Sequence, residues 1–295
     1  MILQGFNILD HNKDGTWTAS HLKSAQKQWR LCPEERFGEQ PVLFNALAFC
    51  SGFLLSNDPP WIGTASHCVQ GQIEEYWVIF GFQMLDHSTP NLLFRADDVY
   101  SARGVVTSGT PTGDVGDYGV LLLDRPVVGH SAYVRVNDQV QVGDSLAIVG
   151  YPMGLPKKTD SGGRVLMSNE TMIRGDLDSY EGNSGAPVFD HRGYLVGLLA
   201  GGSDDFDEVE PSLCRRSKTC PGSEGCEEFG EFIVPIRVLL SDPLLTTHLS
   251  HLHSHQPTDI TNDPSQLASA ILILLVLSGL CVTATIKKHK KSGKT

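Results

Sequence analysis

A serine in a glycine-flanked turn directly before an apolar strand is the feature that most restricts how this chain folds. The stretch Glu-Gly-Asn-Ser-Gly-Ala-Pro-Val-Phe occupies residues 181–189. Glycines on both sides of Ser184 let the backbone turn tightly and bring main-chain N–H groups beside the hydroxyl. A serine alone is a poor nucleophile, so a reactive role for Ser184 requires a base and an orienting acid elsewhere in the chain.

Two upstream segments supply these groups. His67 lies in Thr-Ala-Ser-His-Cys at residues 64–68, and Asp117 stands just before an apolar run at residues 120–123. Asp114 is a rival for the acid, because both aspartates follow a glycine. We favour Asp117, since the apolar strand follows it almost at once. Each residue also has an ordinary structural explanation, as a packed histidine or as a turn residue at the end of a strand.

Short apolar runs separated by turn residues recur along most of the chain and predict an all-β barrel or sandwich. They occupy residues 42–55, 76–82, 120–123, 145–149, 186–189, 194–199 and 232–235. The chain has 34 acidic and 23 basic residues, for a net charge of −11. Because nucleic-acid binding depends on neutralising phosphates with Lys and Arg, this balance argues against a nucleic-acid partner.

In the histidine, aspartate and serine segments the chain resembles the trypsin-like serine endopeptidases of the chymotrypsin fold, in the bacterial-type variant with Gly-Asn-Ser-Gly. The order His67, Asp117, Ser184 is that family's order and differs from the order in subtilisin and in the α/β-hydrolases. The resemblance covers about residues 41–245. It implies two six-stranded antiparallel β-barrels and a serine endopeptidase that acts on proteins or peptides and requires no cofactor.

The resemblance also implies catalytic roles. Ser184 would attack the peptide carbonyl, His67 would take and return the proton, and Asp117 would orient the imidazole. Backbone N–H groups of Gly182 and Ser184 match the family's oxyanion hole. The residue before the nucleophile is Asn183, where animal digestive relatives carry an aspartate that pairs with a newly cut N-terminus. Since an amide carries no charge, we expect activity without such processing.

Four positions match the specificity pocket of the family: Asp178, Ser179, Leu199 and Gly202. Asp178 stands near the place where members specific for basic residues carry a pocket-floor aspartate, which favours cleavage after Arg or Lys. Bacterial-type relatives often carry this aspartate without that preference, so the alternative stays open. Leu199 stands where glutamyl endopeptidases have a histidine, which argues against a preference for Glu.

Six of the seven cysteines lie outside an apolar C-terminal run, and this number permits three disulfides and indicates an oxidising compartment. The family resemblance implies that Cys50 pairs with Cys68. The partners of the other four, Cys32, Cys214, Cys220 and Cys226, stay open. A metal site is the competing interpretation of the last three, but their spacing fits no standard zinc pattern.

Residues 1–31 contain a stretch that resembles a degenerate EF-hand, a helix–loop–helix unit. Oxygen-bearing residues stand at loop positions one, three, five and seven, and a glycine stands at six: Asp10, Asn12, Asp14, Thr16 and Gly15. His21 replaces the bidentate Glu at position twelve, so calcium affinity should be weak or absent. A metal-free unit and a weak calcium site both stay open.

The rest of the chain divides into a protease-like domain at 33–247, a His-rich stalk at 248–266, a membrane span at 267–286 and a basic tail at 287–295. The twenty residues of the span carry no charge and would cover about 30 Å as a helix. The lysine cluster that follows favours a cytoplasmic tail. We therefore expect a single-pass membrane protein with an extracellular or lumenal catalytic domain.

The first residues lack the basic and apolar regions of a signal peptide. Either an upstream segment is missing, which we favour, or the chain is tail-anchored with its catalytic domain in the cytosol. Two alternatives to a simple protease also follow from the sequence. One is a catalytically silent binding module on the same scaffold, and the other is a protease regulated by calcium through the N-terminal loop.

Overall fold

The computed structural model describes residues 1–4, 9–43, 48–110, 116–132, 135–218 and 230–249. All of these residues belong to one compact unit. No helix within these ranges is long and apolar enough to cross a membrane. The predicted span at 267–286 and the tail at 287–295 lie outside the described residues, as does the stalk beyond Leu249.

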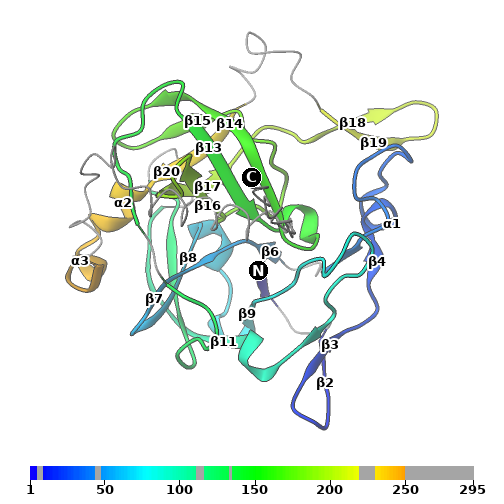
Figure 1. Cartoon of the computed structure of the whole chain (residues 1–295), viewed down its shortest axis with the longest axis horizontal. Helices are drawn as coiled ribbons and strands as arrows, with labels where there is room; N and C mark the ends of the chain where they lie inside the picture. The colour runs from blue at the N-terminus through cyan, green and yellow to red at the C-terminus, as the bar shows by residue number, and fades with distance from the viewer. Residues whose placement is uncertain (5–8, 44–47, 111–115, 133–134, 219–229, 250–295) are drawn as a thin grey trace, which may run out of the picture. The chain divides into compact units, whose positions relative to one another are not determined.

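The first half of the fold is built on a seven-stranded antiparallel sheet (Figure 1). Its strands, in spatial order, are β6 (Ala48–Cys50), β1 (Ile2–Gln4), β9 (Tyr76–Ile79), β11 (Val99–Ser108), β12 (Gly119–Leu123), β8 (Pro60–Thr64) and β7 (Phe53–Asn57). Bulky apolar side chains such as Ile62, Tyr100 and Leu121 are fully buried in its core. Their burial supplies the main driving force for this half of the fold.

The second half is a closed barrel of six antiparallel strands. The strands, in order around the barrel, are β13 (Ser145–Gly150), β14 (Lys158–Ser168), β15 (Ile173–Gly175), β20 (Glu231–Pro235), β17 (Leu195–Gly201) and β16 (Pro187–Asp190). Inward-facing residues including Leu146, Val188 and Ile233 form its core. The mostly β prediction is confirmed, and this half matches the expected six-stranded barrel.

The first half differs from the expected six-stranded barrel. Its edge strands β6 and β7 are consecutive in the chain, and Ser51 and Gly52 separate them. The backbone N–H of Ser51 donates to the carbonyl oxygen of Ser184 at 2.9 Å, so it is used outside the sheet. Strand β1 adds a further difference, because it pairs with both β6 and β9.

The N-terminal segment is part of this fold, so the expected EF-hand-like unit at 1–31 is wrong. Strands β2 (Leu9–His11) and β3 (Trp17–Ala19) form a hairpin, and β10 (Leu93–Phe94) pairs with β3. Leu9 and Ala19 are buried in a core shared with the sheet. Tertiary packing therefore selects strands where the oxygen pattern of the loop suggested flanking helices.

The oxygen-bearing side chains of that loop hold the hairpin turn together. The side-chain amide of Asn12 donates to the hydroxyls of Thr16 and Thr18 at 2.9 and 2.8 Å. Thr16 donates through its N–H and hydroxyl to Asp14 at 3.0 and 2.7 Å. These hydrogen bonds lower the pKa of Asp14, and they explain the polar pattern without a metal.

Smaller elements complete the described part. They include the strands β4 (Lys23–Ser24), β5 (Pro41–Val42), β18 (Phe206–Val209) and β19 (Cys214–Ser217). The helices are α1 (Ala25–Trp29), α2 (Ile236–Leu240) and α3 (Pro243–Leu249), with short 3-10 turns η1 (Ser66–Val69), η2 (Ile73–Glu75), η3 (Ala96–Asp98) and η4 (Pro152–Gly154).

The β18–β19 hairpin lies beside the α1 segment (Figure 1). A disulfide between Cys32 and Cys214 ties the two together. A second disulfide joins Cys50 to Cys68, which confirms the pairing that the family resemblance implied. Cys220 and Cys226 lie outside the described residues.

Candidate active site

His67 is held at the junction between β8 and the short turn η1. Strand β8 ends at Thr64, and η1 begins at Ser66. The disulfide from Cys68 to Cys50 fixes this turn to the end of β6. The imidazole is therefore placed by a strand end and a covalent link, and its side chain is still 37% exposed.

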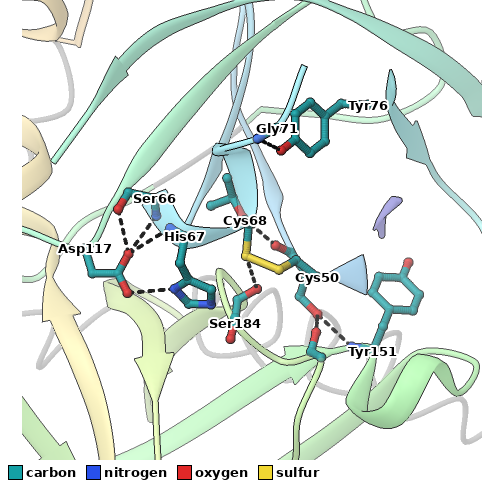
Figure 2. Close-up of a disulfide and its surroundings, with 12 residues drawn as sticks. Cys50, Ser66, His67, Cys68, Gly71, Tyr76, Asp117, Tyr151 and Ser184 are labelled. Atoms are coloured by element: carbon teal, nitrogen blue, oxygen red, sulfur yellow. Dashed lines mark hydrogen bonds and ion pairs between the residues drawn. A yellow bond between two sulfur atoms is a disulfide. The ribbon is translucent and has the colours of Figure 1, made fainter. Parts of the chain in front are cut away.

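Asp117 reaches the histidine from the loop before β12. The Nδ1 atom of His67 donates to Oδ2 of Asp117 at 2.8 Å (Figure 2). The other carboxylate oxygen, Oδ1, accepts hydrogen bonds from the N–H and hydroxyl of Ser66, both at 2.8 Å, and from the N–H of His67 at 3.2 Å. With its proton on Nδ1, the neutral ring leaves Nε2 free to act as a base.

The pKa of Asp117 reflects two opposing influences. Burial disfavours the charged form and would raise the pKa. The hydrogen bond and charge of His67, together with the hydrogen bonds from Ser66 and the main chain of His67, outweigh burial and hold the pKa below its ordinary value. Asp117 is thus an ionised acceptor at neutral pH and is suited to stabilise an imidazolium ion.

Ser184 sits in the predicted turn between the two halves of the molecule. Gly182 and Gly185 have φ values of 95° and 82°, which side-chain-bearing residues rarely adopt. A Cβ added at Gly185 would overlap Oγ1 of Thr64 and the carbonyl oxygen of Ser51. The glycine therefore allows the serine turn to press against the end of β8, close to His67.

The hydroxyl of Ser184 lies beside the imidazole of His67 (Figure 2). In the described part of the chain this hydroxyl makes no hydrogen bond to His67 or to any other group. The carbonyl oxygen of Ser184 is held by the N–H of Ser51 and lies 3.8 Å from Sγ of Cys68. Catalytic hydrogen bonds are often long in free enzymes and shorten when substrate binds, so this geometry is compatible with proton transfer.

Two main-chain donors of the serine turn are available to a ligand. The N–H groups of Gly182 and Ser184 make no hydrogen bond within the described ranges. The carbonyl oxygen of Gly182 accepts from the hydroxyl of Ser51 at 2.8 Å, and the same hydroxyl accepts from the N–H of Tyr151 at 2.9 Å. These contacts hold the turn from behind and leave the two predicted oxyanion donors unoccupied.

Asn183 points away from this surface into the interior. Its side-chain nitrogen donates to Oγ of Ser179 at 3.0 Å, whereas its buried Oδ1 has no hydrogen-bond partner in the described structure. A cavity of about 110 Å³ lies next to Asn183 and is also lined by Arg36 and Tyr180. No charged N-terminus is needed to satisfy a neutral amide at this position.

Three of the four predicted pocket residues have other partners. Asp178 forms an ion pair with Arg36 at 2.5 Å, and its side chain is 47% exposed. Leu199 is buried in the core of the closed barrel, so its side chain packs there and the pocket-wall assignment is not supported. Ser179 holds Asn183 as described, and Gly202 alone keeps an open position one residue after β17.

The structure brings another acid to Gly202, which the sequence analysis missed. A Cβ at Gly202 would overlap both carboxylate oxygens of Glu231, the first residue of β20. Glu231 is only 8% exposed. The signal was present in the strand alternation, because Glu231 lies two residues before Ile233 and so shares the barrel-facing side of β20.

No metal centre emerges from the described residues. Cys50, His67 and Cys68 offer donor atoms within 4.8 Å of one another, but both cysteines are in a disulfide and supply no thiolate. The calcium-ligand candidates Asp14 and Thr16 hydrogen-bond to each other, and Asp10 lies on strand β2.

Comparisons with known proteins agree with the sequence resemblance. A glutamyl endopeptidase of Bacillus licheniformis is 26% identical over 152 residues, which cover 50% of this chain and 46% of that protein. A glutamyl endopeptidase of Staphylococcus epidermidis is 32% identical over 76 residues, or 25% of this chain and 27% of that protein. The chain thus spans half or less of the length of these relatives.

Solved structures that align with this chain include two peptidases. Neuropsin from mouse brain aligns with a TM-score of 0.46 and 17% identity over 70% of this chain and 92% of that chain. A kallikrein-related peptidase 10 complex with zinc aligns with a TM-score of 0.43 and 18% identity over 80% of this chain and 100% of that chain. Residues 50–198, about half of the sequence, match the family model of the trypsin-like peptidase domain. The chain therefore belongs to the trypsin-like peptidase family.

Proposed function

We propose that this chain is a serine endopeptidase whose catalytic residues are His67, Asp117 and Ser184. The observation that carries the proposal is the 2.8 Å hydrogen bond from Nδ1 of His67 to Asp117, on a ring whose other edge faces Ser184 (Figure 2). The family membership supports the same reaction class. A buried acid, a histidine and a glycine-flanked serine then act together on a peptide bond.

The reaction begins with attack of Ser184 Oγ on the carbonyl carbon of the peptide. Nε2 of His67 accepts the hydroxyl proton as the new C–O bond forms. Asp117 stabilises the resulting imidazolium, which then protonates the leaving amine as the C–N bond breaks. Water, activated by the same histidine, hydrolyses the acyl-enzyme and restores Ser184. Each step uses side chains and main-chain groups of this chain, so we propose no cofactor.

The negative charge of the tetrahedral intermediate would be received by the N–H groups of Gly182 and Ser184. Loss of one such donor typically costs about 2.7–4 kcal/mol of transition-state stabilisation. The hydrogen bonds from Ser51 to the carbonyl oxygens of Gly182 and Ser184 fix the turn before substrate arrives. A donor pair fixed in advance requires little reorganisation during the reaction.

Two substrate classes compete for the specificity of this site. The relatives are named glutamyl endopeptidases, which favours cleavage after Glu. Acidic residues around Gly202 favour cleavage after Arg or Lys instead, as a negative pocket would repel a Glu side chain. We propose the basic class, and the structural argument for it is developed below.

Labelling with a fluorophosphonate probe tests the proposed chemistry directly, because such a probe reacts with an activated serine. We expect labelling of the full chain and its complete loss in Ser184→Ala. Ser161→Ala is a matched control, since Ser161 is exposed on β14. Full labelling of Ser184→Ala, or none of the folded native chain, would favour a catalytically silent binding module.

A further inference from the structure

Glu231 is a buried carboxyl group without a partner. It is more than nine-tenths buried, yet no hydrogen bond or ion pair reaches its side chain from any described residue. An unpaired carboxylate in such a place is costly, since no donor from the described part of the chain replaces the hydration that burial removes. A buried acid of this kind calls for a ligand or a proton to compensate its charge.

Glu231 lies against an exposed stretch of main chain at Gly202. Gly202 is exposed, and its α-carbon lies directly against the carboxylate, because any Cβ there would overlap both oxygens. Gly202 follows the end of β17, whose residue Gly201 pairs with Phe232 next to Glu231. Because Gly202 has no side chain, only its main chain lies over the carboxylate of Glu231 at this position.

The serine turn is joined to the same region by two sets of contacts. The carboxylate of Asp205 accepts a hydrogen bond at 2.8 Å from the N–H of Glu181, three residues before Ser184. The N–H of Gly185 donates at 2.7 Å to the carbonyl oxygen of Leu199 on β17. Asp205 and strand β17 are thus both tied to the serine turn, and β17 pairs with β20 next to Glu231.

Charged neighbours make this region strongly acidic. Burial, together with the negative charges of Asp205 and Asp178, raises the pKa of Glu231 to about 8. Burial also raises the pKa of Asp205 to about 6, against the hydrogen bond from the N–H of Glu181 and the charge of Arg215, which lower it. The guanidinium of Arg36 is already paired with Asp178. Of these acids, Glu231 has the pKa that is raised furthest above its ordinary value.

We propose that Glu231, with Asp205 behind it, forms the acidic floor of the subsite for the substrate residue before the cleaved bond, and that this subsite takes a Lys or Arg side chain. The proposal rests on the proposed endopeptidase function. An ammonium or guanidinium group supplies both the charge and the donors that the Glu231 carboxylate lacks. A substrate Glu would add a further carboxylate beside two existing ones.

The proposal reassigns the specificity determinant. Asp178, the acid that the family resemblance indicated, is half-exposed and neutralised by Arg36. Glu231 comes instead from β20 and is buried and unpaired. Since exposed, paired carboxylates contribute little to binding, the charge that discriminates among substrates lies on Glu231.

A pH signature follows from the same geometry. The cation binds the ionised form of Glu231, so the free enzyme must release a proton first. Preference for a Lys substrate over an Ala substrate therefore rises as pH passes through about 8, the pKa of Glu231. A substrate with an apolar side chain at this position shows no such rise, because its binding does not require the charge.

Binding of butylguanidine to the full chain carrying Ser184→Ala tests the site without relying on catalysis. This probe carries the cation and aliphatic stem of an arginine side chain. By calorimetry at pH 8.5 we expect binding, with at least about 30-fold weakening when Glu231→Gln is added, as expected for loss of a charge-assisted hydrogen bond. Glu210→Gln, an exposed change of the same type, should have no effect.

The outcomes separate the subsite from the chemistry. Absent binding, or binding that Glu231→Gln leaves unchanged, overturns the proposal, and so does binding lost in Asp178→Asn alone. If butylguanidine binds but the native chain is not labelled by a fluorophosphonate, the proposed endopeptidase function is wrong and the cation site remains. A thermal melt of each variant confirms that the protein used is folded.

Peptides that differ only in the residue before the cleaved bond provide the second test. The ratio of kcat/KM for the Lys peptide over the Ala peptide should fall roughly 100-fold in Glu231→Gln, because only the Lys side chain loses a charged partner. Glu231→Asp, which keeps the charge, should restore part of the ratio. Fastest cleavage after Glu, or a Lys preference that survives Glu231→Gln, contradicts the proposal.

Discussion

Two buried carboxyl groups lie near the serine turn, and their surroundings differ sharply. Asp117 accepts four hydrogen bonds, two from Ser66 and two from His67. Glu231 accepts none from any described residue. The pKa of Asp117 is lowered, whereas that of Glu231 is raised to about 8. Both are removed from water, so the number of donors decides which one is charged at neutral pH.

This difference shows how one fold gives two acids distinct tasks. Asp117 carries a permanent charge that fixes the imidazole and is ready before substrate binds. Glu231 keeps its proton at neutral pH, because its charge would cost free energy without a cation beside it, so in the proposal its ionisation is coupled to the substrate. In the proposed mechanism the first acid serves rate and the second serves selection.

Removing the charge of Asp117, the acid that accepts four hydrogen bonds, should have the largest effect on kcat/KM. Asp117→Asn keeps the shape of the side chain but disturbs the tautomer of His67, so we expect kcat/KM to fall by about 10⁴-fold. Initial rates with one good peptide substrate measure the change. Asp114→Asn is the matched control, because Asp114 also follows a glycine and was the rival acid in the sequence. A larger loss in Asp114→Asn than in Asp117→Asn would contradict the assignment.

Removing the titratable group of Glu231, the acid without donors among the described residues, should change how the free energy of unfolding depends on pH. The folded chain keeps the Glu231 proton up to about pH 8, whereas the unfolded chain loses it near the ordinary value of 4.5. The free energy of unfolding therefore falls as pH rises across that window, by at most about 1.4 kcal/mol per unit. Glu231→Gln should flatten this slope.

Denaturant unfolding at pH 5, 7 and 9 measures that effect. The native chain should lose a few kcal/mol more than Glu231→Gln between the first and last values. Glu210→Gln serves as the control for a surface change of the same chemistry. Parallel curves for the native chain and Glu231→Gln would show that Glu231 titrates in the folded state as it does in water.

Deleting one hydrogen-bond donor to Asp117 should bring its pKa slightly closer to the raised pKa of Glu231. Ser66→Ala removes the hydroxyl hydrogen bond to Oδ1 at 2.8 Å and leaves the main-chain donors in place. We expect the pKa of Asp117 to rise and kcat to fall by up to about 10-fold, because a hydrogen bond to a charged group contributes about 1.5–3 kcal/mol and the remaining main-chain donors replace part of it. An unchanged kcat across the pH profile would show that the main-chain donors suffice.

The smallest expected effect comes from freeing an acid near Glu231. Arg36→Gln breaks the ion pair with Asp178 and leaves one more negative charge beside Glu231. The pH midpoint of the Lys-over-Ala preference should then move upward by a few tenths of a unit, since an exposed charge is well screened. Profiles recorded at low and high salt should differ in this shift. A downward move would contradict the electrostatic picture.

Sequence reasoning reached the triad because its signals are local. Two flanking glycines identify Ser184. His67 and Asp117 are identified by the apolar strands next to them in the sequence. The structure brings His67 and Asp117 into contact across fifty residues of sequence. The disulfide from Cys50 to Cys68 was implied by the resemblance of this region to the family, and it is confirmed.

The N-terminal loop and the pocket were not accessible in the same way. The spacing of Asn12, Asp14 and Thr16 suits a calcium-binding loop. The same spacing also suits a hairpin turn that is closed by side-chain hydrogen bonds. The role of Asp178 depends on Arg36, which lies 142 residues away in the chain. Strand alternation places Glu231 on the same side of β20 as Ile233, but its position against Gly202 depends on the register of β20 in a closed barrel, which no short pattern encodes.

Ser51 has a consequence for when this protein becomes active. A residue between two strands of the first sheet holds the carbonyl oxygens of Gly182 and Ser184, which belong to the turn before the second barrel. During synthesis the early half does not contain Ser184, and the late half has no support for this serine until the early half has formed. Under the proposed mechanism, the chain could therefore not cleave its neighbours, or itself, before both halves have assembled.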